Sequence, residues 1–92
     1  MKNISLERLM IRAIRSFQEK MLSAGRRGEI RNIYAQEGTG SKDTGWKDMT
    51  FKVEYVEHEE YHECYISVTQ SVPEGYVYEE GEDKAQRCRS TN

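Results

Sequence analysis

Near the start of the chain, apolar residues recur every three or four positions, which is the spacing of one face of an α-helix. The pattern covers residues 5–24, with Ser5 as a candidate N-cap and Gly25 as the stop. The residues on the apolar stripe are Leu6, Leu9, Met10, Ala13, Ile14, Phe17 and Met21. We therefore predict one amphipathic helix. Ile11 and Leu22 lie beside the stripe, where they could widen the core contact or contact a second subunit.

After Gly28 the apolar positions alternate with polar ones, which is the period of a strand with one buried face. The predicted strands cover residues 29–37, 46–56, 61–72 and 75–80, with a turn-rich connection at 38–45 and a turn at Pro73 and Gly75. The apolar set changes from odd positions up to Tyr55 to even positions from Cys64. Because a strand keeps one face, this change predicts a turn or bulge near 57–60, although that segment lacks Gly or Asn.

These elements predict an α+β fold, in which one N-terminal amphipathic helix packs on a three- to four-stranded antiparallel sheet. Residues 1–80 form the single expected domain, and residues 81–92 have no apolar period and are expected to be a flexible tail. The sequence has no apolar run of membrane-spanning length and no apolar signal segment at its start. We expect a cytoplasmic protein.

Charge is distributed unevenly along the 92 residues, although the formal net charge is only −2. Residues 1–40 carry eight Lys or Arg against four Asp or Glu, whereas residues 41–92 carry six against twelve. Between Val53 and Asp83 there is no Lys or Arg, while ten acidic residues and five of the six tyrosines lie there. This block of Glu and Tyr is the most unusual feature of the sequence.

Residues 58–62, HEEYH, match the H-E-x-x-H motif of zinc metalloproteases. That motif needs a helix, because helical spacing brings both imidazoles to one side of the metal. Here β-branched and aromatic neighbours favour a strand, so we expect no peptidase and no metal cofactor. A metal-binding protein that uses His58, His62 and Cys64 stays as an alternative, and Cys64 could instead be a reduced core residue or be bridged to Cys88.

A second alternative is nucleic-acid binding through an arginine face of the helix. Arg8, Arg12 and Arg15 share one side of it, and Arg26, Arg27 and Arg31 could extend the stripe. Glu19 interrupts the stripe and the chain as a whole is acidic, so nucleic acid is the less favoured ligand. The segment GTGSKDTGWK only loosely matches a phosphate-binding loop, since Trp46 occupies the Lys position, and a hairpin is expected there.

The leading hypothesis is a non-enzymatic protein-binding module with an acidic, tyrosine-bearing strand surface. The expected partner is a protein with a basic surface, for example one that binds nucleic acid, so that the module could act as an inhibitor or a DNA mimic. Glu57 and Glu59 are expected about 7 Å apart on one face of a strand, a spacing similar to that of backbone phosphates. The predicted partner-binding residues are Glu54, Glu57, Glu59, Tyr61, Glu63 and Tyr65.

The small size, high charge and absence of a recognisable catalytic motif are similar in general terms to small accessory proteins of phages and mobile elements. Many such proteins inhibit a host protein, which agrees with the binding hypothesis. The alternative for the same block is that the Glu side chains only solvate an exposed face while the tyrosines cover the core edge. A homodimer is also expected to be possible, because a core this small leaves apolar residues beside the helix stripe.

Overall fold

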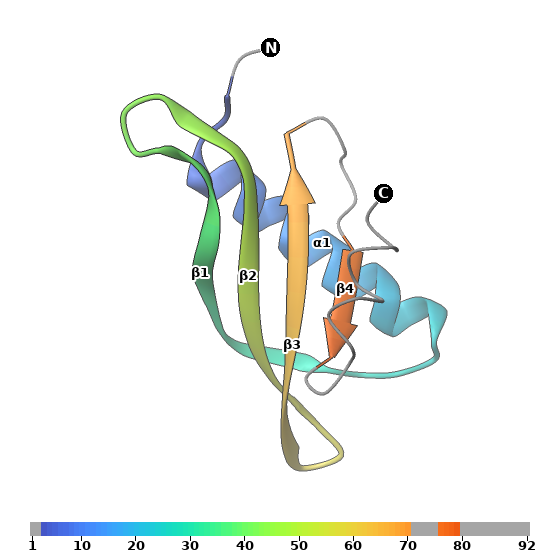
Figure 1. Cartoon of the computed structure of the whole chain (residues 1–92). Coiled ribbons are helices and arrows are strands. Elements are labelled where there is room, and N and C mark those ends of the chain that lie inside the picture. Colours follow the sequence, from blue (N-terminus) through green and yellow to red (C-terminus); the bar gives the residue numbers. More distant parts are fainter. Residues whose placement is uncertain (1–2, 71–75, 80–92) are drawn as a thin grey trace.

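The computed structural model describes residues 3–70 and 76–79 as one helix followed by four strands (Figure 1). The elements are α1 (Leu6–Ser23), β1 (Glu29–Ser41), β2 (Gly45–Glu57), β3 (Glu60–Thr69) and β4 (Tyr76–Glu79). The α+β class is therefore confirmed. The predicted turn at 73–75 and the tail at 81–92 lie outside the described residues. In the described ranges, the single helix lacks the length and apolar character needed to span a membrane.

Both ends of α1 are capped as the sequence predicts. At the start, Ser5 Oγ accepts a hydrogen bond from the backbone N–H of Arg8 at 3.3 Å. At the other end, Gly25 has a φ of 68°, and its N–H donates to the Leu22 carbonyl at 3.1 Å. The N–H of Arg26 donates to the Met21 carbonyl at 2.8 Å, which completes a Schellman motif. The cap therefore turns the chain sharply and leaves Arg26 at the foot of the helix.

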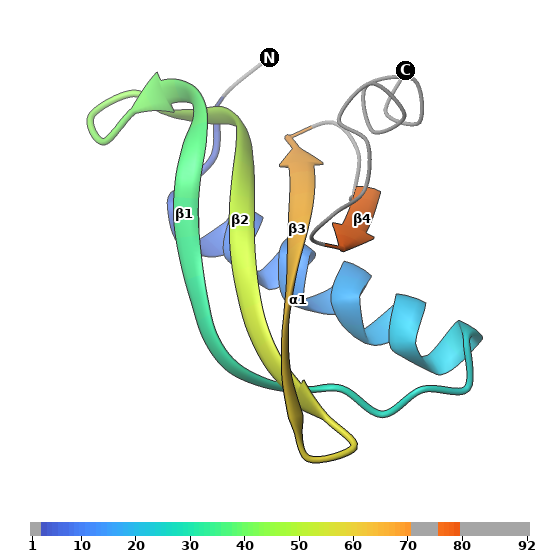
Figure 2. The ribbon, with the colours of Figure 1, turned by 60° about the horizontal axis from the view of Figure 1, so that its bottom comes forward.

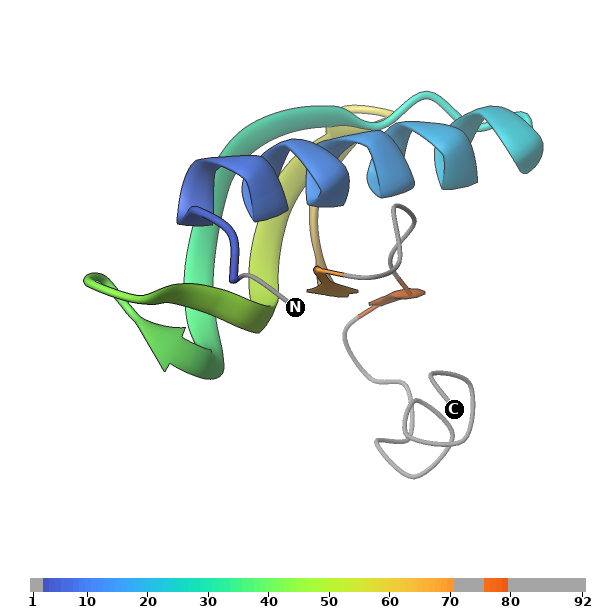
Figure 3. The ribbon, with the colours of Figure 1, turned by 90° about the horizontal axis from the view of Figure 1, so that it is seen from above.

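The four strands form an antiparallel meander in the order β1-β2-β3-β4. The helix crosses one side of this sheet, and the sheet curves around it (Figures 2 and 3). We call the side that contacts α1 the inner face and the other side the outer face. Among the described residues, no helix or strand covers the outer face.

The hydrophobic core lies between α1 and the inner face. Its buried residues are Leu9, Ala13, Phe17 and Met21 from the helix, Met49, Phe51, Val53 and Tyr55 from β2, and Cys64, Ile66 and Val68 from β3. The rings of Phe17 and Tyr55 pack edge to face, with centroids 4.9 Å apart. Beside the stripe, Ile11 and Leu22 are 51% and 82% exposed, so neither widens the core contact.

A tight hairpin between β2 and β3 explains why the apolar residues change from odd to even positions there. Only His58 and Glu59 lie between the two strands, and their φ angles are 53° and 64°. Positive φ at both loop residues is typical of a type I′ turn, for which Asn-Gly is the favoured sequence. Because the left-handed region is unfavourable for residues with a Cβ, this turn holds backbone strain at the tip of the hairpin.

Replacing the turn with Asn-Gly should stabilise the protein. The double variant His58→Asn/Glu59→Gly is expected to raise the free energy of unfolding by about 1 kcal/mol, because both residues then accept positive φ readily. Urea unfolding followed by circular dichroism measures the change. A matched control is Glu60→Asn, which alters a strand residue outside the turn and should bring no gain. An unchanged or lowered stability of the double variant would contradict the assignment of strain to this turn.

The connection between β1 and β2 is shorter than the sequence predicts. The segment 38–45 was expected to be a loop because it is rich in glycine, but β1 continues to Ser41 and β2 begins at Gly45. Gly38 lies opposite Met49 in the sheet, and a Cβ at this position would lie 2.2 Å from the carbonyl oxygen of Asp48. This glycine therefore permits a close approach of two strands within the sheet and does not end the strand.

Candidate functional site

The outer face combines side chains from β1, β2 and β3 in rows that run across the strands. One row consists of Asn32, Glu54 and Glu63, which we call the acidic row. The adjacent row consists of Tyr34, Lys52 and Tyr65, which we call the tyrosine row. Directly opposed residues of antiparallel strands have side chains on the same face, close enough to interact. The register therefore brings two carboxylates and two phenol rings together from three strands.

The acidic row places two like charges opposite each other, because Glu54 and Glu63 are direct cross-strand partners. Glu54 Oε1 accepts hydrogen bonds from Asn32 Nδ2 at 3.1 Å and from the Tyr34 hydroxyl at 3.3 Å. Glu63 Oε2 lies 3.2 Å from Lys52 Nζ. Like charges in this position destabilise a sheet, and these neighbours partly offset the repulsion. Lys52 is thus a basic neighbour of the acidic row.

In the tyrosine row, the pKa values of Lys52 and Tyr34 are both raised by their environment. The hydrogen bond from Lys52 to Glu63 holds the pKa of the ammonium above its usual 10.5, and the nearby charge of Glu54 acts in the same direction. Loss of solvent raises the pKa of the Tyr34 hydroxyl above 10.0, and Glu54 raises it further. Both groups therefore keep their protons at neutral pH, so Lys52 stays cationic and Tyr34 stays a hydrogen-bond donor.

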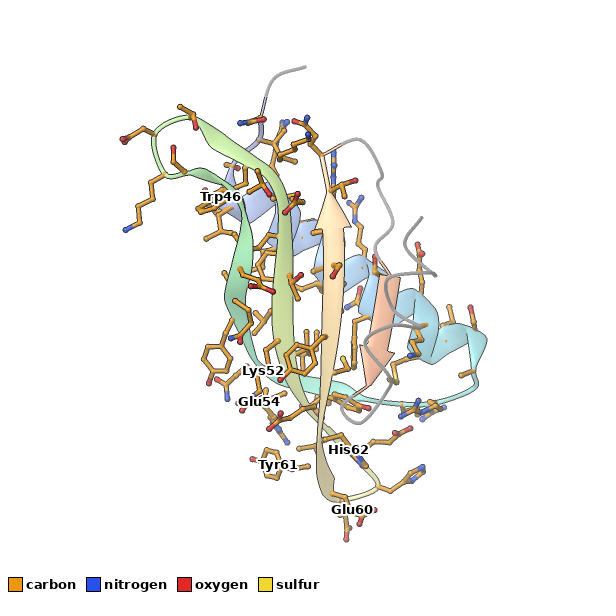
Figure 4. The ribbon with its side chains drawn as sticks, in the orientation of Figure 1. Trp46, Lys52, Glu54, Glu60, Tyr61 and His62 are labelled. Atoms are coloured by element: carbon orange, nitrogen blue, oxygen red, sulfur yellow. The ribbon has the colours of Figure 1, made fainter. Side chains whose placement is uncertain are left out.

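The hairpin of β2 and β3 extends the outer face to its tip. Tyr61 lies opposite Val56, and 76% of its surface is exposed. Lys52, Glu54 and Tyr61 follow one another down the hairpin, and Glu60 lies at its end (Figure 4). Tyr65 is half-buried in the tyrosine row, and Glu59 is exposed in the turn. Of the six predicted partner-binding residues, the structure brings four to the outer face: Glu54, Tyr61, Glu63 and Tyr65.

The prediction that Glu57 belongs to the partner-binding surface is wrong, because Glu57 lies on the inner face and is only 6% exposed. Its carboxylate accepts hydrogen bonds from the guanidinium of Arg26, from Nη2 to Oε1 at 2.6 Å and from Nε to Oε2 at 3.0 Å and Oε1 at 3.2 Å. Arg26 Nη2 also donates to the Tyr55 hydroxyl at 3.2 Å. The expected row of Glu57 and Glu59 at phosphate spacing does not form, since Glu57 ends β2 and Glu59 lies in the turn.

The sequence contained a signal for the position of Glu57. This residue has the same parity as Val53 and Tyr55, which are buried, so continuing the alternation to the end of β2 places it on the inner face. The contribution of β1 had no comparable local signal. Asn32 and Tyr34 are about twenty positions away from Glu54 in the sequence, and only the register of the sheet brings them to it.

The residues of the metal-binding alternative are separated in the structure. His58 is exposed in the turn, the ring of His62 stacks on Tyr55 at 5.4 Å, and Cys64 is fully buried in the core. In the part of the chain that the structure describes, no group of three His, Cys, Asp or Glu side chains is arranged to hold a metal ion. The HEEYH segment forms a turn and the start of β3, so it lacks the helix that the metalloprotease motif requires.

The predicted arginine stripe is also divided among different contacts. Arg12 Nη1 donates to the carbonyl oxygens of Thr69 and Gln70 at 3.0 and 2.7 Å, which ties the helix to the end of β3. Arg26 binds Glu57 as described above, and Arg31 lies 3.4 Å from Glu29. Arg12, Arg26 and Arg31 therefore hold contacts within the chain. A continuous phosphate-binding stripe does not follow from this arrangement.

The candidate site is therefore the outer face, a surface of carboxylates and phenol groups on a rigid sheet. Carboxylates accept hydrogen bonds from Arg and Lys, and phenol rings offer flat surfaces on which a guanidinium can stack. Such groups can recognise a cation without carrying out a reaction. No protein-family model, curated protein or solved structure matches this chain.

Proposed function

We propose that this chain is a small non-enzymatic protein-binding module that uses its outer face to engage a basic surface of a partner protein. The observation that carries the proposal is the pairing of Glu54 with Glu63 on a face that no described element covers. Tyr34, Tyr61 and Tyr65 lie in the rows on either side of this pair. The proposal assigns the partner contact to these five residues.

The energetics of the acidic row support a role in binding. A cross-strand pair of like charges is unfavourable for the isolated sheet, and local conflicts of this kind are typical of functional sites. An arginine from a partner could bind both carboxylates and stack on Tyr65 or Tyr34, which would remove the repulsion. The complex would then be free of the unfavourable repulsion between Glu54 and Glu63 that is present in the unbound sheet.

The same chemistry supports an inhibitory form of the proposal. Arginine and lysine side chains that bind phosphates also bind carboxylates. A module with an acidic outer face would therefore compete with nucleic acid for a basic groove on its partner. In this form the module acts by occupying the groove, without any chemical step.

A charge-removing double variant tests the outer face. Glu54→Gln/Glu63→Gln should weaken binding to a basic partner at least tenfold, because charged pairs buried in an interface contribute strongly to affinity. Partners are first isolated on immobilised wild-type protein, and affinities are then measured by calorimetry with each purified partner. In the inhibitory form, duplex DNA or RNA that the partner binds should displace the module.

The control for this test is Glu7→Gln/Glu19→Gln, which removes the same charge from exposed positions of α1. It should leave the affinity within about twofold of wild type, because exposed charges far from an interface contribute little. Equal affinity of wild type and the Glu54→Gln/Glu63→Gln variant would exclude the outer face. Equal losses in both double variants would reduce the interaction to non-specific attraction, which also contradicts the proposal.

A further inference from the structure

The outer edge of β1 is a second candidate surface, which borders the outer face. The strand order makes β1 a terminal strand, and of the described strands only β2 pairs with it. β1 runs over thirteen residues, so a long series of backbone groups points away from β2. Such an edge is a template for pairing with another strand.

The side chains of β1 show which faces a partner strand would have to match. Three register shifts interrupt the pairing of β1 with β2, around Arg31, around Gln36 and between Thr39 and Gly40. The pairing with β2 places Ile30, Ile33, Ala35 and Gly38 on the inner face, and Glu29, Asn32, Tyr34, Glu37 and Thr39 on the outer face. In a continuous sheet, a residue of the partner strand must lie on the same face as the residue that it opposes.

A second copy of β1 satisfies this condition when a two-fold axis passes through Tyr34. Tyr34 then faces its own copy on the outer face, and Ile33 faces Ala35 on the inner face. Further along the strand, Arg31 lies on the outer face, because its Nη1 is 3.4 Å from Oε1 of Glu29. In this register Arg31 of each copy would lie opposite Glu37 of the other, which gives two symmetric ion pairs. An axis through Ile33 would oppose Arg31, which lies beside Glu29 on the outer face, to Ala35 on the inner face. It would also oppose Glu29 to Glu37, two like charges, on both sides.

We propose that the protein forms a two-fold homodimer in which β1 pairs with β1 of a second copy, centred on Tyr34. The charge complementarity of Arg31 and Glu37 selects this register over the one centred on Ile33. Tyr34 supports the contact because it is 45% exposed in the single chain and would stack against its own copy. The dimer has one eight-stranded sheet with a continuous outer face, and it does not depend on the proposed function.

Charge exchange tests the dimer in the intact chain. Sedimentation velocity over about 1–100 µM should show a monomer–dimer equilibrium for the wild type. Arg31→Glu and Glu37→Arg should each raise the dissociation constant roughly tenfold, because each reversal replaces two attractive pairs with two repulsive ones. The double variant Arg31→Glu/Glu37→Arg should restore dimerisation. Glu7→Arg, on the helix, is the control and should leave the equilibrium unchanged.

Cysteine cross-linking tests the register independently. In a Cys88→Ser background, Tyr34→Cys should give a disulfide-linked dimer under mild oxidation, because opposed Cα atoms in an antiparallel pair lie within bridging distance. Ile33→Cys should stay monomeric on a non-reducing gel. A monomer at all concentrations, a double variant that fails to restore the dimer, or a cross-link at Ile33 in place of Tyr34 would each overturn the proposal.

Discussion

Replacing Phe51 by alanine is expected to cost about 3–5 kcal/mol of unfolding free energy. Phe51 is fully buried at the centre of the sheet, where it lies opposite Ala35 of β1 and Ile66 of β3. A chain of this length has a total stability of roughly 5–14 kcal/mol, so the loss removes a large part of it. The substitution leaves a cavity between α1 and the inner face that the surrounding side chains cannot fill completely.

Thermal unfolding followed by circular dichroism measures this effect. At roughly 4–8 °C per kcal/mol for a domain of this size, the midpoint should fall by about 12–40 °C. Tyr61→Ala provides the control, because it removes an aromatic ring of similar size from the exposed outer side of the same hairpin. We expect its cost to stay below about 1 kcal/mol. Equal losses for Phe51→Ala and Tyr61→Ala would contradict the placement of the core.

The second large effect is expected at the ion pair between Arg26 and Glu57. This pair joins the foot of α1 to the end of β2, and the Glu57 carboxylate is buried. Both Glu57→Gln and Arg26→Met should lower the stability at neutral pH, because each leaves one charged partner without its counterion. The exposed control Glu60→Gln, which lies opposite Glu57 in the hairpin, should cause a much smaller loss. Similar losses for the two Gln variants would contradict the role of the pair.

The same pair makes stability depend on pH in a defined direction. The hydrogen bonds from Arg26 hold the pKa of Glu57 below its ordinary value of 4.5, although burial of the carboxyl acts in the opposite direction. The contribution of the charged form is therefore complete above pH 4.5 and is lost as the pH falls through the lower pKa of the folded state. Urea titrations should show the gap between wild type and Glu57→Gln closing on acidification below pH 4.5. A gap that widens there would contradict the assignment.

The two proposals share Tyr34 but otherwise use different residues of the same sheet, and their tests are separable because they change different residues. The acidic row lies in the middle of the outer face, whereas the dimer contact uses the edge of β1. Glu54→Gln/Glu63→Gln should weaken partner binding and leave the dimer intact. Arg31→Glu should weaken the dimer, and a loss of partner binding in that variant would then indicate that the partner requires both copies.

Local sequence patterns determined the helix, its caps, the main strands and the position of the β2–β3 turn. These features depend on periodicity and on single residues such as Ser5 and Gly25, so they can be recognised from a short stretch of the sequence. The turn was found from the change of parity alone, since His58 and Glu59 are not typical turn residues. The acidic and tyrosine-rich character of the later strands was likewise evident from composition.

Only the tertiary structure decided which of those side chains share a surface. It paired Glu57 with Arg26, thirty-one positions away, and removed this carboxylate from the predicted binding face. It also extended β1 through glycines that composition alone assigns to a loop, and brought Tyr34 to Glu54. Such outcomes depend on strand register and on contacts between distant segments, and local propensity carries little information about either.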